Sequence, residues 1–285
     1  MSRFKTPLRY PGGKGKLTEY IRSIIELNSL SDCHYAEVYA GGAGVGVSLL
    51  MLEYASKIHL NDINPSIYAF WQSVLEMPDE LCSLISKTDV TVEEWRKQKN
   101  VQTDNHNYNF LELGFSTFFL NRTNRSGIIK GGVIGGKAQE GKWKLDVRFN
   151  KAELISRIQK IATYSDRIHL TKLDAIDFIN NQLPLLPTKT FVYLDPPYYI
   201  KGEGLYENHY KHDDHELVSK AIASIHNKNW IVSYDNVPAI SKLYEQFKQK
   251  TYGLKYSAQS KYTGSEVMIY SPNLFIPEEE ILLRA

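Results

Sequence analysis

The chain has 285 residues, a formal net charge of +2 and 42% hydrophobic residues, which suits one large globular domain or a domain with an insertion. Two cysteines, Cys33 and Cys82, exclude a disulfide framework and indicate a reducing compartment. The first residues form no apolar signal segment, and the uncharged run at 40–52 is too short to span a bilayer. We therefore expect a soluble cytoplasmic protein.

The N-terminal part alternates helix and strand signals. Apolar residues recur at helical spacing over 15–28, and a strand-like run at 35–39 leads into a glycine cluster. A helix is predicted over 45–54, a second strand over 57–62, and another helix after Asn64-Pro65, because proline is tolerated in a first helical turn. This order is typical of a βαβ unit in a mostly parallel sheet.

The pattern changes near residue 77. Helical signals cover 93–99, 108–120 and 151–161, and 121–141 is predicted as loop or hairpin. Between residues 121 and 160 there are ten basic and three acidic side chains. This local excess suits a polyanion such as nucleic acid, although an ordinary solvated surface is the alternative.

Strand and helix signals alternate again toward the C-terminus. They fall on 168–170, 176–180, 191–194, 215–226, 230–234, 254–256 and 266–270. The sequence therefore predicts an α/β domain formed by residues 1–76 and 162–285, interrupted by a mostly helical insertion at 77–161.

The sequence contains two glycine clusters, and they indicate different kinds of site. The first, at 11–16, lacks the Ser or Thr that a phosphate-binding loop requires after its lysine, because Leu17 follows Lys16. The second, at 37–46, follows a predicted strand, and Asp62 ends the next one. A carboxylate there can accept both hydroxyls of a ribose, as in nicotinamide dehydrogenases and S-adenosylmethionine enzymes. A plain tight turn is the alternative.

The sequence Asp195-Pro196-Pro197-Tyr198 directly follows the buried strand predicted at 191–194. Two prolines cannot continue a sheet, so the strand must stop there. The resulting turn presents one carboxylate, one backbone carbonyl and one aromatic ring, which are the groups that an enzyme needs to act on an exocyclic amine of a nucleobase. The alternative is a strand followed by a structural proline-rich loop.

Four ordered motifs give the chain a resemblance to the Dam-type (D12 class) DNA N6-adenine methyltransferases. They are residues 8–14 (LRYPGGK), 37–42 (EVYAGG), 61–65 (NDINP) and 195–198 (DPPY), and 118–123 also resembles the start of that family's DNA-recognition region. The resemblance implies a Rossmann-like, S-adenosylmethionine-dependent methyltransferase fold. It implies a mixed seven-stranded sheet with helices on both faces and an antiparallel hairpin formed by the last two strands.

The resemblance also implies roles for individual residues. The cofactor would be bound by Tyr10, Gly12, Lys14, Glu37, Tyr39, Ala40, Gly41, Gly42, Asp62, Ile63, Asp174, Ala175 and Asp195. Catalysis would depend on Asp195, Pro196, Pro197 and Tyr198. DNA would be contacted by Arg9, Arg122, Asn124, Arg125 and Lys137, with arginine and asparagine suited to base edges and lysine to phosphates.

Adenine chemistry suggests how these residues would work. The N6 lone pair is delocalised, so we expect Asp195 and the Pro196 carbonyl to accept the two N6 hydrogens and turn the lone pair toward the methyl group. The base must leave the duplex to be reached, and Tyr198 is expected to stack on it. Such an enzyme would act on double-stranded DNA in a bacterial or phage-infected cell, associated with the nucleoid.

Several alternatives stay open at this point. The substrate can be another planar amine, such as cytosine N4 or an RNA adenine, and a catalytically silent DNA-binding subunit or a dehydrogenase is a different class. His209, His212 and His215 lack a familiar zinc spacing, so we expect no metal. A monomer is compatible with one chain that carries all the parts. The recognition sequence and any separate restriction endonuclease are not encoded in these motifs.

Overall fold

The computed structural model describes residues 6–9, 17–200, 210–256 and 262–278. The strands are β1 (Cys33–Glu37), β2 (Ala55–Asn61), β3 (Ile168–Thr171), β4 (Thr190–Leu194), β5 (Asn229–Asp235), β6 (Lys248–Tyr256) and β7 (Tyr262–Tyr270). The α-helices are α1 (Thr18–Leu27), α2 (Gly44–Met51), α3 (Pro65–Glu76), α4 (Pro78–Lys87), α5 (Val92–Thr103), α6 (Phe110–Thr123), α7 (Lys151–Ala162), α8 (Ala175–Asp177), α9 (His212–Ala223) and α10 (Pro238–Leu243).

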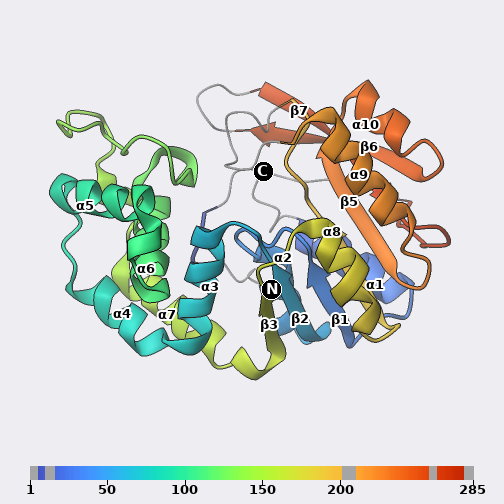
Figure 1. Ribbon diagram of the computed structural model, residues 1–285, viewed down its shortest axis with the longest axis horizontal. Helices are drawn as coiled ribbons and strands as arrows, with labels where there is room; N and C mark the ends of the chain where they lie inside the picture. The colour runs from blue at the N-terminus through green and yellow to red at the C-terminus, as the bar shows by residue number, and fades with distance from the viewer. Residues whose placement is uncertain (1–5, 10–16, 201–209, 257–261, 279–285) are drawn as a thin grey trace. The chain divides into compact units, whose positions relative to one another are not determined.

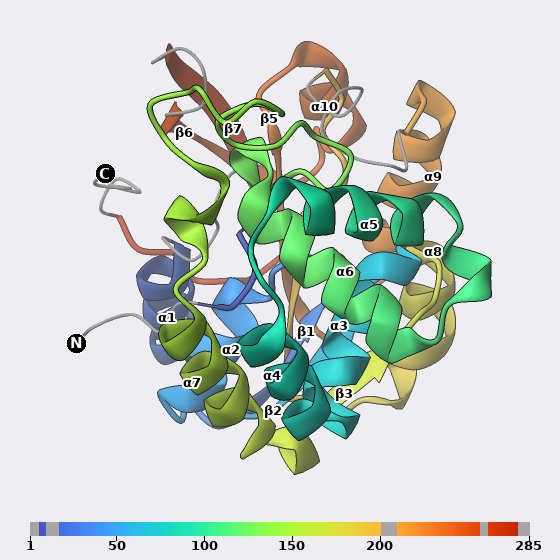
Figure 2. The ribbon, with the colours of Figure 1, turned by 90° about the vertical axis from the view of Figure 1, so that its left-hand side faces the viewer.

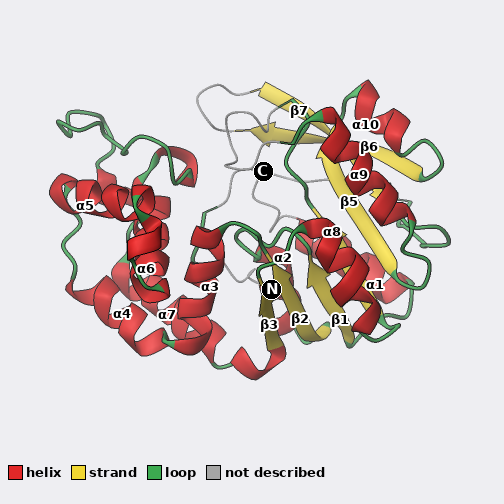
Figure 3. Ribbon diagram, viewed as in Figure 1, coloured by secondary structure: helices red, strands yellow, loops and turns green. Residues whose placement is uncertain are grey.

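The strands form one seven-stranded sheet in the order β3-β2-β1-β4-β5-β7-β6. Figure 3 distinguishes the strands, in yellow, from the helices, in red. β1 pairs in parallel with β2 and β4, and β4 with β5, whereas β7 runs antiparallel to both β5 and β6. This confirms the predicted α/β fold with a mixed sheet and a C-terminal antiparallel hairpin. Because β1, β2, β4 and β5 are parallel, their carboxyl ends share one edge of the sheet, where ligands of such folds bind.

The chain divides into two compact units. Unit 1 consists of Met1–Phe4, Lys14–Ile63 and Leu173–Ala285, and unit 2 of Lys5–Gly13 and Asn64–Lys172. The predicted insertion at 77–161 falls inside unit 2, together with α3. That this insertion is a target-recognition domain stays a prediction.

Alternating side chains divide the sheet of unit 1 into two faces. Ala36, Val192 and Val232 belong to one apolar cluster with residues of α8, α9 and α10, and Figure 1 shows these helices beside β1 and β5. On the opposite face, α2 comes close to β1, because a Cβ built on Gly46 would lie 3.3 Å from both the Glu37 carboxylate and the Tyr35 ring. Helices therefore cover both faces of the sheet.

Most predicted elements are present with shifted ends, and short polar residues explain where the helices begin. Asn64 caps α3, accepting from the backbone N–H groups of Ser66 and Ile67. Asn109 and Glu112 form a reciprocal capping box at α6. The helices α4 and α10 were not predicted from the sequence; each begins at a proline, Pro78 and Pro238, in the tolerated first turn.

Unit 2 is a helical assembly in which α6 lies beside α3 and α5, and α4 beside α7 (Figure 2). At Gly114, α6 packs tightly against α3. A Cβ at this position would lie 2.6 Å from the backbone oxygen of Ala69 and 2.4 Å from the Ser73 hydroxyl. Glycine is therefore required here by helix packing, which outweighs its poor helix propensity.

Gly114→Ala should lower the free energy of unfolding by about 1–3 kcal/mol, because the added methyl group overpacks a backbone contact. Urea denaturation checks this. Gly132→Ala is the matched control, since a Cβ there meets no heavy atom within 4 Å. Equal stabilities of the two variants would show that α3 and α6 can separate at little cost.

Candidate functional site

Asn61, the last residue of β2, connects three predicted parts of the cofactor site. Its side chain is 1% exposed and donates to the carbonyl oxygens of Val38 and Leu173, each at 3.0 Å. Its amide oxygen accepts from the backbone N–H of Leu173 at 3.0 Å. The segments that precede Tyr39 and Asp174 are therefore held against the residue that precedes Asp62.

The glycine cluster forms a tight turn beside Asp62. The Gly41 backbone N–H donates to Asp62 Oδ2 at 2.8 Å, and Gly41 itself has a φ of +46°. Ala43 is also left-handed, at φ +44°, and immediately precedes α2. Next to Asp62, the Ile63 side chain is 44% exposed. The turn thus brings a carboxylate, backbone amides and an accessible apolar side chain to one place.

Glu37, at the end of β1, lies in the interior of unit 1. Its carboxylate accepts from the backbone N–H of Gly46 at 2.8 Å. The pKa of Glu37 is raised to about 8, mainly by burial and to a smaller extent by the nearby charge of Asp195, against the lowering effect of the hydrogen bonds from Gly46 and Tyr35. Near neutral pH this side chain is therefore mostly a neutral acid that joins β1 to α2.

Asp174 and Ala175 lie where β3 leads into α8. The Asp174 side chain caps this short helix by accepting from the Ile176 backbone N–H at 2.8 Å. The expected contact of Asp174 with an adenine amine stays a prediction.

Tyr39, which is also expected to bind the cofactor, contacts Tyr210. The hydroxyls of the two tyrosines lie 3.3 Å apart, and their rings pack edge to face.

Asp195 directly follows β4, whose five residues are all buried. Its side chain is half-buried, while Pro196 and Pro197 are buried. Asp195 Oδ1 accepts a hydrogen bond of 2.6 Å from the hydroxyl of Ser233 on β5. The two prolines end the strand, as predicted, and the carboxylate stands at the edge of the sheet.

The backbone that follows Asp195 is held by a second carboxylate on β5. Asp235 is 3% exposed and accepts from the backbone N–H groups of Tyr199 at 2.8 Å and Ile200 at 2.9 Å. Ser233 and Asp235 are two residues apart, so they share one face of β5. One strand therefore fixes both the Asp195 side chain and the turn.

Tyr198 is 4% exposed, and its hydroxyl donates to Glu266 at 2.6 Å. Glu266 is fully buried on β7 and also accepts from the hydroxyl of Tyr252 at 2.6 Å. The hydroxyl end of this side chain is therefore anchored in the protein. That the ring stacks on a flipped base stays a prediction.

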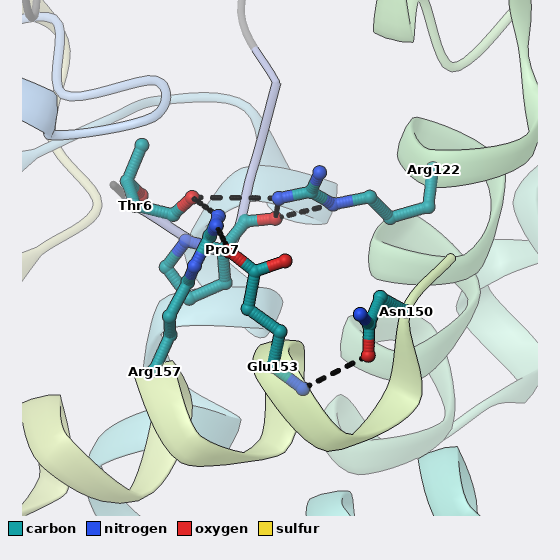
Figure 4. Close-up of polar contacts among 6 residues, drawn as sticks. All are labelled: Thr6, Pro7, Arg122, Asn150, Glu153 and Arg157. Atoms are coloured by element: carbon teal, nitrogen blue, oxygen red, sulfur yellow. Dashed lines mark hydrogen bonds and ion pairs between the residues drawn. The ribbon is translucent and has the colours of Figure 1, made fainter. Parts of the chain in front are cut away.

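Two residues predicted to contact DNA have structural roles within unit 2. Arg122 is 7% exposed, and its guanidinium donates to the carbonyl oxygens of Pro7 and, at 3.4 Å, Thr6. Arg157 also donates to Thr6 and forms an ion pair with Glu153 (Figure 4). Burial of the guanidinium, followed by the neighbouring Arg157, lowers the pKa of Arg122 to about 9.

Asn124, which the resemblance assigns to a base edge, is likewise fully buried. Its amide oxygen accepts from the Trp95 indole N–H at 2.6 Å, and its amide nitrogen donates to the carbonyl oxygens of Ile128 and Ile129 at 2.9 Å. Asn124 therefore shapes the loop after α6. Of the segment 121–141, predicted as loop or hairpin, the first three residues belong to α6, and the rest is mostly loop with an isolated bridge between Asn124 and Val133.

Other predicted DNA contacts are accessible. Arg125 and Lys137 are exposed, and Arg9 is partly exposed, with its backbone N–H and C=O bound by the Asn121 side chain at 2.6 Å each. Trp143 was missed, although it is 61% exposed and Lys142 lies 5.6 Å from its ring centre. The tripeptide Lys-Trp-Lys at 142–144 was the available signal.

Some predicted residues lie outside the described part of the chain. These are Tyr10, Gly12, Lys14 and His209. Within the described part, His, Cys, Asp and Glu side chains form no group of three that would suit a metal ion. None of the helices in the described ranges is long and apolar enough to cross a bilayer.

Comparison with known families agrees with the residue patterns. The chain matches the model of the D12 class N6 adenine-specific DNA methyltransferases over residues 10–258. That match includes all four motifs except the first two residues of the N-terminal one. The protein belongs to this family.

The modification methylase StsI of Streptococcus sanguinis is 26% identical over 209 residues, which are 69% of this chain and 29% of that protein. The chain thus spans less than a third of that relative's length. Among solved structures, an S-adenosylmethionine-dependent methyltransferase from Agrobacterium tumefaciens has a TM-score of 0.44 at 8% identity, covering 91% of this chain and 62% of that one. The rRNA methyltransferase AviRa from Streptomyces viridochromogenes has a TM-score of 0.38 at 12% identity, covering 88% and 82%.

The pKa of Glu37 has a consequence for stability. The folded protein keeps the Glu37 proton at pH values at which the unfolded chain releases it. The contribution of Glu37 to the free energy of unfolding is therefore complete below the unfolded-state pKa near 4.5, and it falls as the pH rises toward about 8. Glu37→Gln keeps an acceptor for Gly46 but does not titrate. Its free energy of unfolding should therefore rise relative to wild type between pH 5 and pH 8, as denaturant titrations measure. The exposed Glu140→Gln serves as control, and parallel profiles for Glu37→Gln and wild type would contradict the assignment.

Proposed function

We propose that this protein is a site-specific DNA adenine-N6 methyltransferase that uses S-adenosylmethionine and acts on a flipped-out adenine in double-stranded DNA. The observation that carries the proposal is the Asp195 turn, where a carboxylate, a proline carbonyl and an aromatic residue end β4 at the ligand-binding edge of the sheet. Membership of the D12 class supports the same reaction.

The residues around Asp62 fit S-adenosylmethionine. The hydrogen bond from Gly41 holds the Asp62 carboxylate beside the glycine turn, which supports its proposed binding of ribose hydroxyls, and the exposed Ile63 offers an apolar surface for the adenine ring. The left-handed turn leads into the N-terminus of α2, and the positive end of a helix dipole suits an anionic carboxylate. When bound, this cofactor supplies an electrophilic methyl group on a sulfonium.

Asp195 and the Pro196 carbonyl are the protein groups that act on the adenine amine. Asp195 accepts one N6 hydrogen and the Pro196 oxygen accepts the other, which favours a pyramidal nitrogen with its lone pair directed at the methyl group. Fixed acceptors of this kind stabilise the positive charge that develops on the nitrogen. The reaction needs no covalent enzyme intermediate.

The loop that follows α6 supplies the accessible cations. Arg125, Lys130, Lys137, Lys142 and Lys144 are exposed there, and Trp143 is exposed among them. Phosphates attract the lysines, and an exposed aromatic ring can stack on a base. We assign DNA contact to these side chains, whereas Arg122 and Asn124 support the scaffold.

Asp195→Ala should lower methyl transfer by about a hundredfold or more, because a charged acceptor is lost at the reacting amine. DNA binding should persist. Modified adenines are detected by single-molecule sequencing of DNA from expressing cells, and DNA binding by a shift assay, with the exposed Asp213→Ala as matched control. N6-methyladenine at one short motif is the expected wild-type result. Modified cytosine instead of adenine would show that the substrate base is cytosine. Substantial turnover by Asp195→Ala would overturn the proposed role of Asp195.

Arg125→Ala should weaken binding to the preferred sequence by about 1–3 kcal/mol and relax the choice of one base, as expected for loss of a bidentate guanine contact. Lys137→Ala is the comparison, since loss of a phosphate contact weakens all sequences alike and reduces the salt dependence. Affinities for a panel of single-base variants distinguish the two. Uniform weakening by Arg125→Ala would place this residue on the backbone instead.

A further inference from the structure

Ser233 contacts Asp195 from the neighbouring strand and belongs to a short chain of hydrogen bonds. Its hydroxyl oxygen lies 2.6 Å from Asp195 Oδ1 and 2.8 Å from the hydroxyl oxygen of Tyr193. Ser233 is fully buried, and Tyr193 is 3% exposed. The hydroxyls of Tyr193 and Ser233 therefore form a chain of hydrogen bonds that ends at the carboxylate used in the proposed reaction.

The direction of these hydrogen bonds follows from the groups present. An ionised carboxylate only accepts, so the single proton of Ser233 is directed to Asp195. The serine oxygen then accepts from Tyr193. Burial, followed by the charge of Asp195, raises the pKa of Tyr193 well above its ordinary value of 10, so the tyrosine keeps the proton that it donates.

We propose that Ser233 is a positioning residue for methyl transfer, which sets the rotation of the Asp195 carboxylate and favours its ionised form, with Tyr193 orienting the serine hydroxyl. This inference rests on the proposed role of Asp195. A hydrogen bond to one oxygen restricts rotation of the carboxylate plane, so the acceptor meets the amine hydrogen at a defined angle. Donation to the charged form also stabilises the anion relative to the acid.

The turn itself is held by other groups, which makes the role of Ser233 separable from folding. Asp235 binds the backbone N–H groups of Tyr199 and Ile200, and Glu266 binds the Tyr198 hydroxyl. Asp235 and Glu266 lie directly opposite each other in the β5–β7 pairing. Removing the Ser233 hydroxyl leaves these contacts in place and should disturb the Asp195 carboxylate and the Tyr193 hydroxyl, which donates to Ser233.

Four further titratable groups near Asp195 are retained in such a variant, and of these only Tyr193 has a hydrogen bond to Ser233 that the variant removes. Glu37 on β1, Tyr193 on β4 and Tyr252 on β6 each interact with the charge of Asp195, and Glu266 on β7 interacts with Tyr193 and Tyr252. A change in the titration of Asp195 after Ser233→Ala is therefore due to the lost hydroxyl.

The kinetic experiment measures single-turnover methyl transfer to a duplex that contains the identified motif. Ser233→Ala should lower the rate constant about tenfold with little change in the Kd for DNA, and the acid limb of its pH–rate profile should move to higher pH. Ser233→Thr should restore most of the rate, and Tyr193→Phe should lower it by a smaller factor. Ser219→Ala is the matched control, because this buried serine donates only to a carbonyl within its own helix.

A second readout needs neither cofactor nor DNA. Carboxyl carbon NMR, with the Asp195 signal assigned by its loss in Asp195→Asn, should give a pKa of Asp195 about one unit higher in Ser233→Ala than in wild type. An unchanged pKa together with an unchanged rate would overturn the inference. A wild-type protein that transfers no methyl group would instead overturn the proposed function, while the NMR result would still test the contact between Ser233 and Asp195.

Discussion

The candidate site depends first on one buried amide at the end of β2. Parallel strands bring their carboxyl ends to one edge, but this does not fix the loops that leave them. Asn61 does so by satisfying three backbone groups of two other segments at 3.0 Å. Because an unsatisfied buried polar group costs about 1–3 kcal/mol, these loops have little freedom to separate. The turn at Gly41, Asp62 and the start of α8 therefore form one preformed surface.

The turn at Asp195, to which the proposal assigns catalysis, is supported by other groups. Proline stops β4, yet two prolines by themselves leave the direction of the following residues open. β5 and β7 supply this direction through Asp235 and Glu266, while Ser233 contacts the Asp195 carboxylate itself. Backbone and side chain are thus fixed by separate groups on adjacent strands. Groups on the strands, rather than a mobile loop, therefore hold the Asp195 carboxylate in place.

Local signals account for what the sequence could predict. Periodicity and proline located most strands and helices, and strand ends located Asp62 and Asp195. The supporting groups could not be found this way, because Ser233 meets Asp195, and Glu266 meets Tyr198, only after distant strands pair. Arg122 and Asn124 show that residue type alone does not determine what a side chain binds. Arginine and asparagine bind carbonyl groups as well as bases, and burial, which decides between these uses, depends on how α6 packs within unit 2.

The electrostatics of the site follow from the same arrangement. Glu37 and Asp195 interact, but burial keeps Glu37 protonated up to a pH of about 8, whereas Asp195 is half-buried and receives a hydrogen bond from Ser233. A neutral Glu37 therefore adds no second negative charge beside Asp195. In the proposed reaction, Asp195 is the charged acceptor and Glu37 a neutral structural acid. The proposed amine substrate and cationic methyl donor would then meet one negative charge instead of two that repel each other.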